Sequence, residues 1–276
     1  GGWRMASGPQ PENMDDGLVC WVCQFADCDE HPEEPLLSTG CACCRPGSSG
    51  GRAHVSCLAS AAAHQDRLWT HCPTCKQYFT GPVRMGLCRA RWELCRSRPE
   101  ADGERLGALG NLASALSDSG DTVAARPLFE ELVAGGRRTL GNGHPGTLSA
   151  IGRLGNLLAR VGDDAGALPL LEEAVAGLRL TLGDEANETL DAMRKLAEVH
   201  GNSGAIAKAR LNFEEVVVTL RRTCPAAPST FTTIGNLGTT IRNAGDLTAA
   251  LALREEAAAS ALRELGLEHP CTQQMA

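Results

Sequence analysis

Apolar residues recur with a helical period through the C-terminal two thirds of the chain. In one segment they lie three, four and seven positions apart and so share one helix face, at Leu109, Leu112, Ala113 and Leu116. After a glycine turn, a second face of the same kind carries Ala125, Leu128, Phe129 and Leu132. Only 4% of the residues are aromatic, so small aliphatic side chains must build the core. The pattern predicts closely packed helix pairs rather than a sheet sandwich.

This pair of helices recurs at a nearly fixed spacing. The turn glycines stand 42, 42 and 41 residues apart, at Gly120, Gly162, Gly204 and Gly245. Three further sets keep the same register, namely alanines at 125, 167, 209 and 250, glutamate pairs at 130–131, 172–173, 214–215 and 255–256, and threonines at 147, 189, 230 and 272. A helix–turn–helix unit repeated at a fixed period is typical of a solenoid. We therefore expect about four repeats over residues 104–276.

The repeats resemble tetratricopeptide (TPR) repeats, and their period is similar to that of the kinesin light-chain variety. The resemblance covers residues 104–272 and includes the connector 137–147, which residues 265–272 echo. The third repeat departs most, because it carries Cys224-Pro225 where the others carry Leu-Gly. The resemblance implies an all-α solenoid whose concave groove binds a protein or peptide client.

In each first helix, the residue that precedes a periodic leucine (112, 154, 196 and 237) should face this groove. With two more positions in the second repeat, these residues give six peptide-binding candidates: Asn111, Arg153, Asn156, Arg160, Lys195 and Asn236. Asparagine can both donate to and accept from a peptide backbone, and the cations favour an acidic peptide.

Cysteines gather in the N-terminal third, where 11 of the 13 precede residue 96. With one histidine they form four close pairs of zinc-type ligands: Cys20 and Cys23, Cys41 and Cys43, His54 and Cys57, and Cys72 and Cys75. Two ligands on one tight turn can reach the same ion, so four pairs provide for two tetrahedral zinc ions. Cys44 is the alternative to Cys43, whereas Cys28, His31, His64 and His71 are not needed to complete the pairs. A disulfide framework is disfavoured, because nothing in the sequence directs the chain to an oxidising compartment.

The order of these ligands resembles that of the RING-CH family of zinc fingers over residues 18–80, although the Cys43–His54 gap is a little long. The resemblance implies a small zinc-stabilised α+β finger with a cross-brace. One ion would be held by Cys20, Cys23, His54 and Cys57, and the other by Cys41, Cys43, Cys72 and Cys75. A plant-homeodomain (PHD) finger, which reads histone tails, has the same ligand order and is the rival interpretation.

RING-CH proteins act as ubiquitin ligases, so the resemblance implies an enzyme without a nucleophile of its own. Such a finger binds a ubiquitin-charged conjugating enzyme and holds its thioester in a reactive pose. The matching positions are Val22 and Pro73 for apolar contact and Lys76 for a hydrogen bond to both partners. The alternative is a non-catalytic reader or scaffold, with a PHD-like finger and TPR protein-interaction repeats.

Two segments complete the expected organisation. Residues 1–17 are rich in Gly, Pro, Ser and Asp and read as a disordered lead-in. Residues 81–103 predict a linker helix, with one face formed by Met85, Cys88, Trp92 and Cys95.

Charge and hydropathy narrow the choice of partners. The net charge of −7 argues against non-specific nucleic-acid binding. No apolar run reaches the length of about 18 residues that a membrane span needs, so we expect a cytoplasmic protein, with the nucleus as the alternative.

Overall fold

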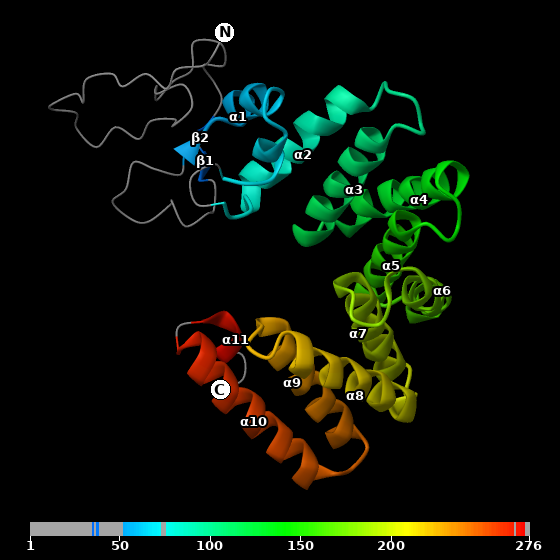
Figure 1. Ribbon diagram of the computed structural model, residues 1–276, viewed down its shortest axis with the longest axis vertical. Helices are drawn as coiled ribbons and strands as arrows, with labels where there is room; N and C mark the ends of the chain where they lie inside the picture. The colour runs from blue at the N-terminus through cyan, green and yellow to red at the C-terminus, as the bar shows by residue number, and fades with distance from the viewer. Residues whose placement is uncertain (1–34, 36, 39–51, 73–75, 268, 274–276) are drawn as a thin grey trace, which may run out of the picture. The chain divides into compact units, whose positions relative to one another are not determined.

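The computed structural model describes residues 35, 37–38, 52–72, 76–267 and 269–273. The chain divides into two compact units, Gly1–Ser97 and Arg98–Ala276 (Figure 1). The predicted lead-in at residues 1–17 lies outside the described residues. Among the described helices, none combines the length and the apolar character that crossing a membrane requires.

The first unit combines a short β-pair with helices. Strand β1 (Leu37–Ser38) pairs antiparallel with β2 (Arg52–Ala53), and Leu37 lies opposite Ala53. Helix α1 (Val55–Ala62), the 3₁₀ helix η1 (Asp66–Trp69) and helix α2 (Gly81–Cys95) follow. An isolated antiparallel bridge joins His71 and Tyr78, so the chain folds back on itself between η1 and α2.

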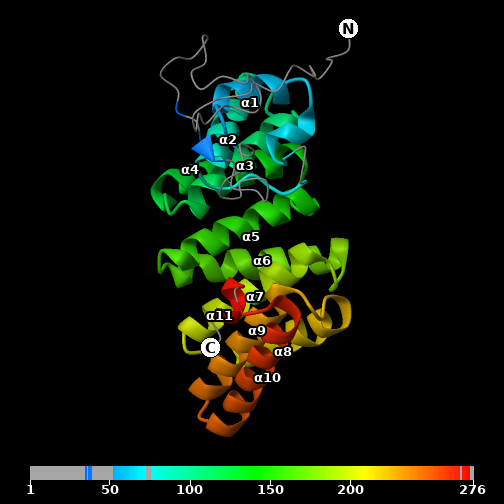
Figure 2. The ribbon, with the colours of Figure 1, turned by 90° about the vertical axis from the view of Figure 1, so that its left-hand side faces the viewer.

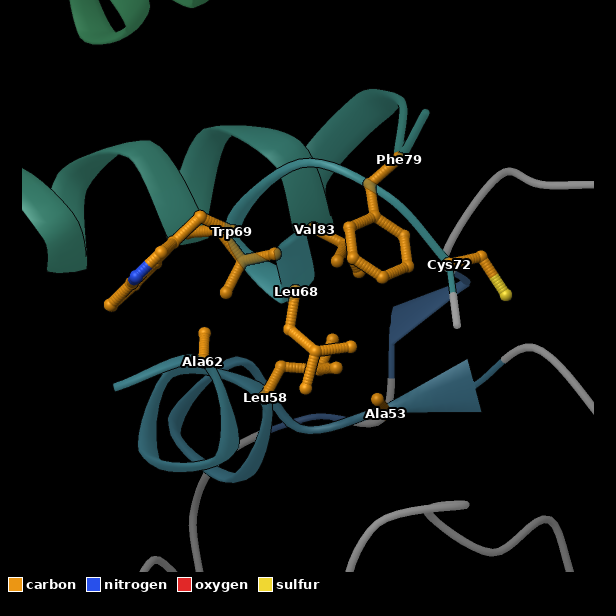
Figure 3. Packing of buried hydrophobic residues seen from close by; sticks show 9 residues of the cluster. Ala53, Leu58, Ala62, Leu68, Trp69, Cys72, Phe79 and Val83 are labelled. Carbon is orange, nitrogen blue, oxygen red and sulfur yellow. The ribbon is translucent and has the colours of Figure 1, made fainter. Parts of the chain in front are cut away.

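One apolar cluster holds these elements together (Figure 3). It consists of Ala53, Leu58, Ala62, Leu68, Trp69, Cys72, Phe79, Val83 and Leu87. Strand β2, α1, η1 and α2 all contribute to it, so a small core spans the described part of the unit. The Arg91 guanidinium lies 5.8 Å from the Trp69 ring centroid and 3.2 Å from an Asp66 oxygen, which ties α2 to η1.

The face of α2 differs in part from the predicted one. Cys88 and Cys95 are buried as expected, but Met85 and Trp92 are only partly buried. Val83 and Leu87, which the predicted stripe omits, are fully buried in the cluster. The helix is therefore part of a core rather than a linker alone. Burial also raises the pKa of the Cys88 thiol, against the opposing charges of Arg84 and Arg91.

The second unit consists of helical hairpins stacked one on the next (Figures 1 and 2). The four pairs are α3 (Gly103–Asp118) with α4 (Thr122–Thr139), α5 (Pro145–Arg160) with α6 (Asp164–Leu182), α7 (Asn187–Asn202) with α8 (Ile206–Thr223), and α9 (Pro228–Asn243) with α10 (Leu247–Leu265). A short helix α11 (Pro270–Gln273) packs against α9 and α10. The predicted all-helical solenoid is confirmed.

The turn inside each hairpin requires glycine. Gly120, Gly162, Gly204 and Gly245 have φ between 81° and 95°, a region that costs residues with a Cβ. Each glycine N–H donates to the carbonyl three residues back, and the next N–H donates to the carbonyl five residues back. This pattern satisfies the free carbonyls at the end of every first helix. The 42-residue glycine spacing therefore marks a repeated helix stop.

The two helices of a hairpin cross through small residues. Ala125, Ala167, Ala209 and Ala250 are at most 3% exposed. A Cβ added to Gly155 would lie 2.9 Å from Leu171 Cγ and 3.3 Å from the Ala167 carbonyl oxygen. At Gly238 it would lie 3.3 Å from the Ala250 carbonyl oxygen. The close approach that the sequence predicts is confirmed, and it leaves no room for a larger side chain.

Neighbouring hairpins are joined differently on their two sides. The first helix of a hairpin contacts the first helix of the next, in the pairs α3–α5, α5–α7 and α7–α9. The second helices are bridged by long side chains, in the ion pairs Arg137–Glu173 (2.7 Å), Arg179–Glu215 (2.5 Å) and Arg221–Glu256 (2.7 Å). The closer spacing of the first helices makes them the inner layer of a curved stack.

The third hairpin departs from the others at two positions. Asp121, Asp163 and Asp246 accept from the N–H three residues on and cap α4, α6 and α10, but the N-cap residue of α8, Ala205, provides no side-chain cap. At the end of α7, His200 occupies the core position that leucine or isoleucine fills in the other repeats, at 116, 158 and 241. Its side chain is nevertheless only 5% exposed.

We expect Ala205→Asp to stabilise the chain. The backbone at Ala205 (φ −78°, ψ 54°) is close to that of Asp163 (φ −88°, ψ 65°), so the new carboxylate can accept from the Lys208 N–H without strain. The gain should be about 0.5–1 kcal/mol in urea unfolding followed by circular dichroism. Asp163→Ala, the matched control, should lose a similar amount. An unchanged or lower midpoint for Ala205→Asp would contradict the prediction.

The wild-type chain should lose stability in acid because of His200, and we expect His200→Leu to abolish this loss. Burial is the main cause of the lowered pKa of His200; Lys208 from α8 lowers it further, and Glu172 from α6 opposes the shift. The unfolded imidazole takes up a proton near pH 6.5, which the folded state resists, so wild-type stability should fall as the pH drops below about 6.5. The advantage of the leucine variant over wild type should therefore grow between about pH 7.5 and 5.5. Urea midpoints measured across this range check it, and a constant difference would refute it.

Candidate functional site

All six predicted groove residues lie on the inner helices. Asn111 is on α3, Arg153, Asn156 and Arg160 on α5, Lys195 on α7 and Asn236 on α9. The two arginines are exposed and the other four residues are partly buried. Four of the six candidates are each followed directly by a leucine. These leucines, at 112, 154, 196 and 237, are at most 7% exposed. Each inner helix thus anchors itself by a leucine and carries a polar side chain directly beside it.

Hydrogen bonds cross from α5 to α3. The Arg153 guanidinium donates to the Ser114 hydroxyl at 3.0 Å. Arg160 donates to the Ser117 carbonyl at 2.9 Å and to its hydroxyl at 2.8 Å. Between the two arginines, the buried Asn156 Oδ1 has no hydrogen-bond partner among the described residues. Both arginines are therefore held in place by neutral oxygen atoms.

A different network joins α7 to α9. Glu198 accepts from Lys195 at 2.9 Å, from Arg194 at 3.1 Å and from the Asn236 amide at 3.4 Å. Arg194 also pairs with Asp191 at 2.8 Å. In this part of the inner layer, the cations and carboxylates neutralise one another.

A small cleft opens between the same two helices. Its volume is about 210 Å³, and α8 forms part of its floor through Val216 and Leu220. The walls come from α7 and α9, with Asn187, Leu190, Asp191, Arg194, Ser229 and Thr233. The inner layer thus offers both hydrogen-bonding groups and a recess of about one side chain in size.

The sequence-based list of peptide-binding candidates does not include four residues that form hydrogen bonds in the inner layer: Ser114, Ser117, Arg194 and Glu198. Two of them could have been found from the period, because Ser114, Asn156 and Glu198 stand 42 residues apart. Arg194 and Ser117 do not stand at these repeated positions. They join the inner layer through their contacts with Glu198 and Arg160, respectively. The period locates the inner face, whereas the pairing on it depends on the packed structure.

Three of the eight predicted zinc ligands lie in the described residues. His54 is fully buried at the N-cap of α1, and its Nδ1 lies 3.7 Å from Cys57 Sγ. Nitrogen and sulfur ligands of one tetrahedral zinc ion stand about 3.6 Å apart, given bonds of roughly 2.0–2.1 and 2.3 Å. The separation of His54 and Cys57 thus fits a shared zinc ion.

Cys72 is hydrogen-bonded to Lys76 and Gln77. Its carbonyl accepts from the Lys76 N–H at 3.0 Å, and its N–H donates to the Gln77 carbonyl at 2.8 Å. The Cys72 sulfur points away from the labelled apolar side chains (Figure 3). Lys76 is exposed and has φ 61°, so a residue other than glycine adopts the left-handed conformation here.

The other predicted finger residues lie outside the described residues. They are Cys20, Cys23, Cys41, Cys43, Cys44 and Cys75 among the ligands and alternatives, and Val22 and Pro73 among the positioning residues. His71 is engaged elsewhere, since its ring centroid lies 4.0 Å from that of Tyr78 and its Nδ1 lies 2.7 Å from the Thr70 hydroxyl. His64 is exposed.

The fold and the polar inner layer define the second unit as a helical-repeat protein-interaction solenoid. Residues 104–179 match one family model of the tetratricopeptide repeat, and residues 230–270 match another. Tetratricopeptide repeats indicate protein–protein interaction.

Solved structures share the fold. A putative kinesin light chain from Podosopora anserina with nearly identical TPR-like repeats is 22% identical, with a TM-score of 0.57, over 76% of this chain and 95% of that one. BtubC (BKLC) from P. vanneervenii is 17% identical, with a TM-score of 0.58, over 78% and 81%. MamA from Desulfovibrio magneticus RS-1 is 15% identical, with a TM-score of 0.52, over 77% and 96%. A comparison with curated proteins finds no significant match.

We expect the full chain to carry two zinc ions in native mass spectrometry. Cys57→Ser should lose one ion, because it removes a ligand placed beside His54. Cys88→Ser is the matched control, a buried cysteine of the same unit outside the ligand pairs, and should keep both ions. Cys43→Ser and Cys44→Ser then decide the second pair, because only the variant that removes the true ligand should lose metal. Equal metal content in Cys57→Ser and wild type would contradict the assignment.

Proposed function

We propose that this chain is a RING-CH-type ubiquitin ligase or adaptor. Its finger binds a ubiquitin-conjugating enzyme, and its TPR groove binds a protein client. The observation that carries the client half is the row of polar side chains along α3, α5, α7 and α9. The finger half rests on the four ligand pairs in the sequence, supported by the spacing of His54 and Cys57.

The two predicted zinc sites have a structural role. Cys20, Cys23, His54 and Cys57 would hold one ion, and Cys41, Cys43, Cys72 and Cys75 the other. A bound zinc ion fixes its loops and supplies no reactive group, because four protein ligands leave no open position. The apolar cluster among the described residues is small, so metal would add to the stability of this unit.

Catalysis in this proposal is positioning. The apolar Val22 and Pro73 contact the conjugating enzyme, and the Lys76 ammonium donates hydrogen bonds that fix ubiquitin relative to it. The exposure of Lys76 supports this role. Its left-handed backbone is a second support, because such strain in a residue other than glycine is often retained for function.

The solenoid supplies the substrate. The inner-layer amides of Asn111, Asn156 and Asn236 suit an extended peptide segment, since each offers a donor and an acceptor. Zinc thiolates require a reducing compartment, so the proposed location is the cytoplasm, with the nucleus as the alternative.

We expect Lys76→Gly to slow ubiquitin discharge from a charged conjugating enzyme by about tenfold, the value of one charge-assisted hydrogen bond. Glycine relieves the left-handed backbone, so folding and zinc content should be kept. Lys76→Arg should retain most activity, because it preserves the cation. Discharge assays across a panel of conjugating enzymes, with metal analysis of each variant, check this.

Inactivity of the zinc-loaded wild-type chain with every conjugating enzyme would refute the ligase proposal. Binding of histone-tail peptides to the same chain would then favour the alternative, a non-catalytic PHD-like finger that binds peptides. Equal rates for Lys76→Gly and wild type would remove Lys76 from the mechanism while leaving the ligase proposal intact.

A further inference from the structure

The cations of the inner layer are not equivalent. Arg153 and Arg160 have no carboxylate within ion-pair distance among the described residues, and both donate only to oxygen atoms of Ser114 and Ser117. Their charges are therefore held in position but not neutralised. An arginine fixed by neutral acceptors keeps donors for a further carboxylate, since its guanidinium carries five N–H groups.

On α7 the balance is the opposite. Lys195 and Arg194 share Glu198, and Arg194 also contacts Asp191. Two cations thus face two carboxylates on the same helix. An incoming acidic group would have to compete with Glu198 for both of them, so this part of the groove should attract little negative charge.

We propose that the groove is divided by charge, with its anion-binding half at α3–α5 and a self-neutralised half at α7–α9. Arg153 and Arg160 are the specificity-determining residues for the acidic segment of a client, and Glu198 restricts acidic residues to their half. This inference rests on the proposed role of the groove in binding a client peptide.

The spacing of the two arginines limits the ligand further. They stand seven residues apart on α5, which is two turns and about 10.5 Å along the helix axis. In a polyproline II segment, residues three apart lie on the same side and about 9 Å from each other, so two carboxylates at that spacing can reach both guanidinium groups. The partner class is therefore a peptide with acidic residues spaced in this way, rather than one with a single terminal carboxylate.

The test measures how the full chain binds a fluorescein-labelled glutamate-rich peptide, with a glutamine-for-glutamate copy as control. Arg153→Gln with Arg160→Gln should weaken binding of the acidic peptide by about tenfold, given modest contributions from each exposed pair. Arg126→Gln with Arg210→Gln makes the same change in net charge on the outer helices α4 and α8, and should leave affinity unchanged.

Glu198→Gln is the sharper variant, because it should tighten binding by about two- to threefold. It keeps an acceptor for Asn236 but releases Lys195 and part of the Arg194 charge. Glu214→Gln on α8 is its matched control, with the same change in net charge outside the groove. A gain restricted to Glu198→Gln would support the division by charge.

Two results would overturn the inference in different ways. If both peptides bind equally well and Asn236→Ala weakens both, the groove binds clients but is not divided by charge. If neither peptide binds the wild-type chain, the groove function and the division both fail. Equal losses for the inner and outer arginine pairs would mean that net charge alone attracts the peptide.

Discussion

The close crossing of two helices within each hairpin is the constraint on which the solenoid depends. At Gly155 and Gly238 even a methyl group would press on the partner helix, and the facing alanines are almost fully buried. Because a single hairpin has little apolar surface to bury, its stability comes from this contact and from packing on its neighbours. The Gly turn between the helices then fixes where each first helix stops.

This arrangement leaves the inner layer available for binding. The leucines at 112, 154, 196 and 237 anchor the first helices, so the residues directly before them contribute little to the core. On the outer side, arginine–glutamate pairs span the wider gaps between second helices. The inner surface can therefore change its polar residues from repeat to repeat without loss of the fold, and the contrast between Arg153 and Lys195 shows this variation.

Much of the solenoid could be predicted from the sequence, because its interactions repeat at a constant spacing. The turn at Gly120 and the core position of Ala125 follow from the period alone. The contact of Glu198 with Asn236 could not be predicted, since it joins two helices whose contacting residues are 38 positions apart in the sequence. The buried face of α2 was only partly predicted, because Val83 and Leu87 are buried by elements far away in sequence.

Binding of a client to the inner layer of first helices is the central claim. Amide hydrogen exchange on the full chain, with and without the glutamate-rich peptide, tests this claim most directly. Binding at the inner layer predicts slowed exchange in the amides of α3 and α5, with little change in the second helices α4, α6 and α8. Protection confined to the second helices would place the peptide on the outer surface and contradict a client-binding groove.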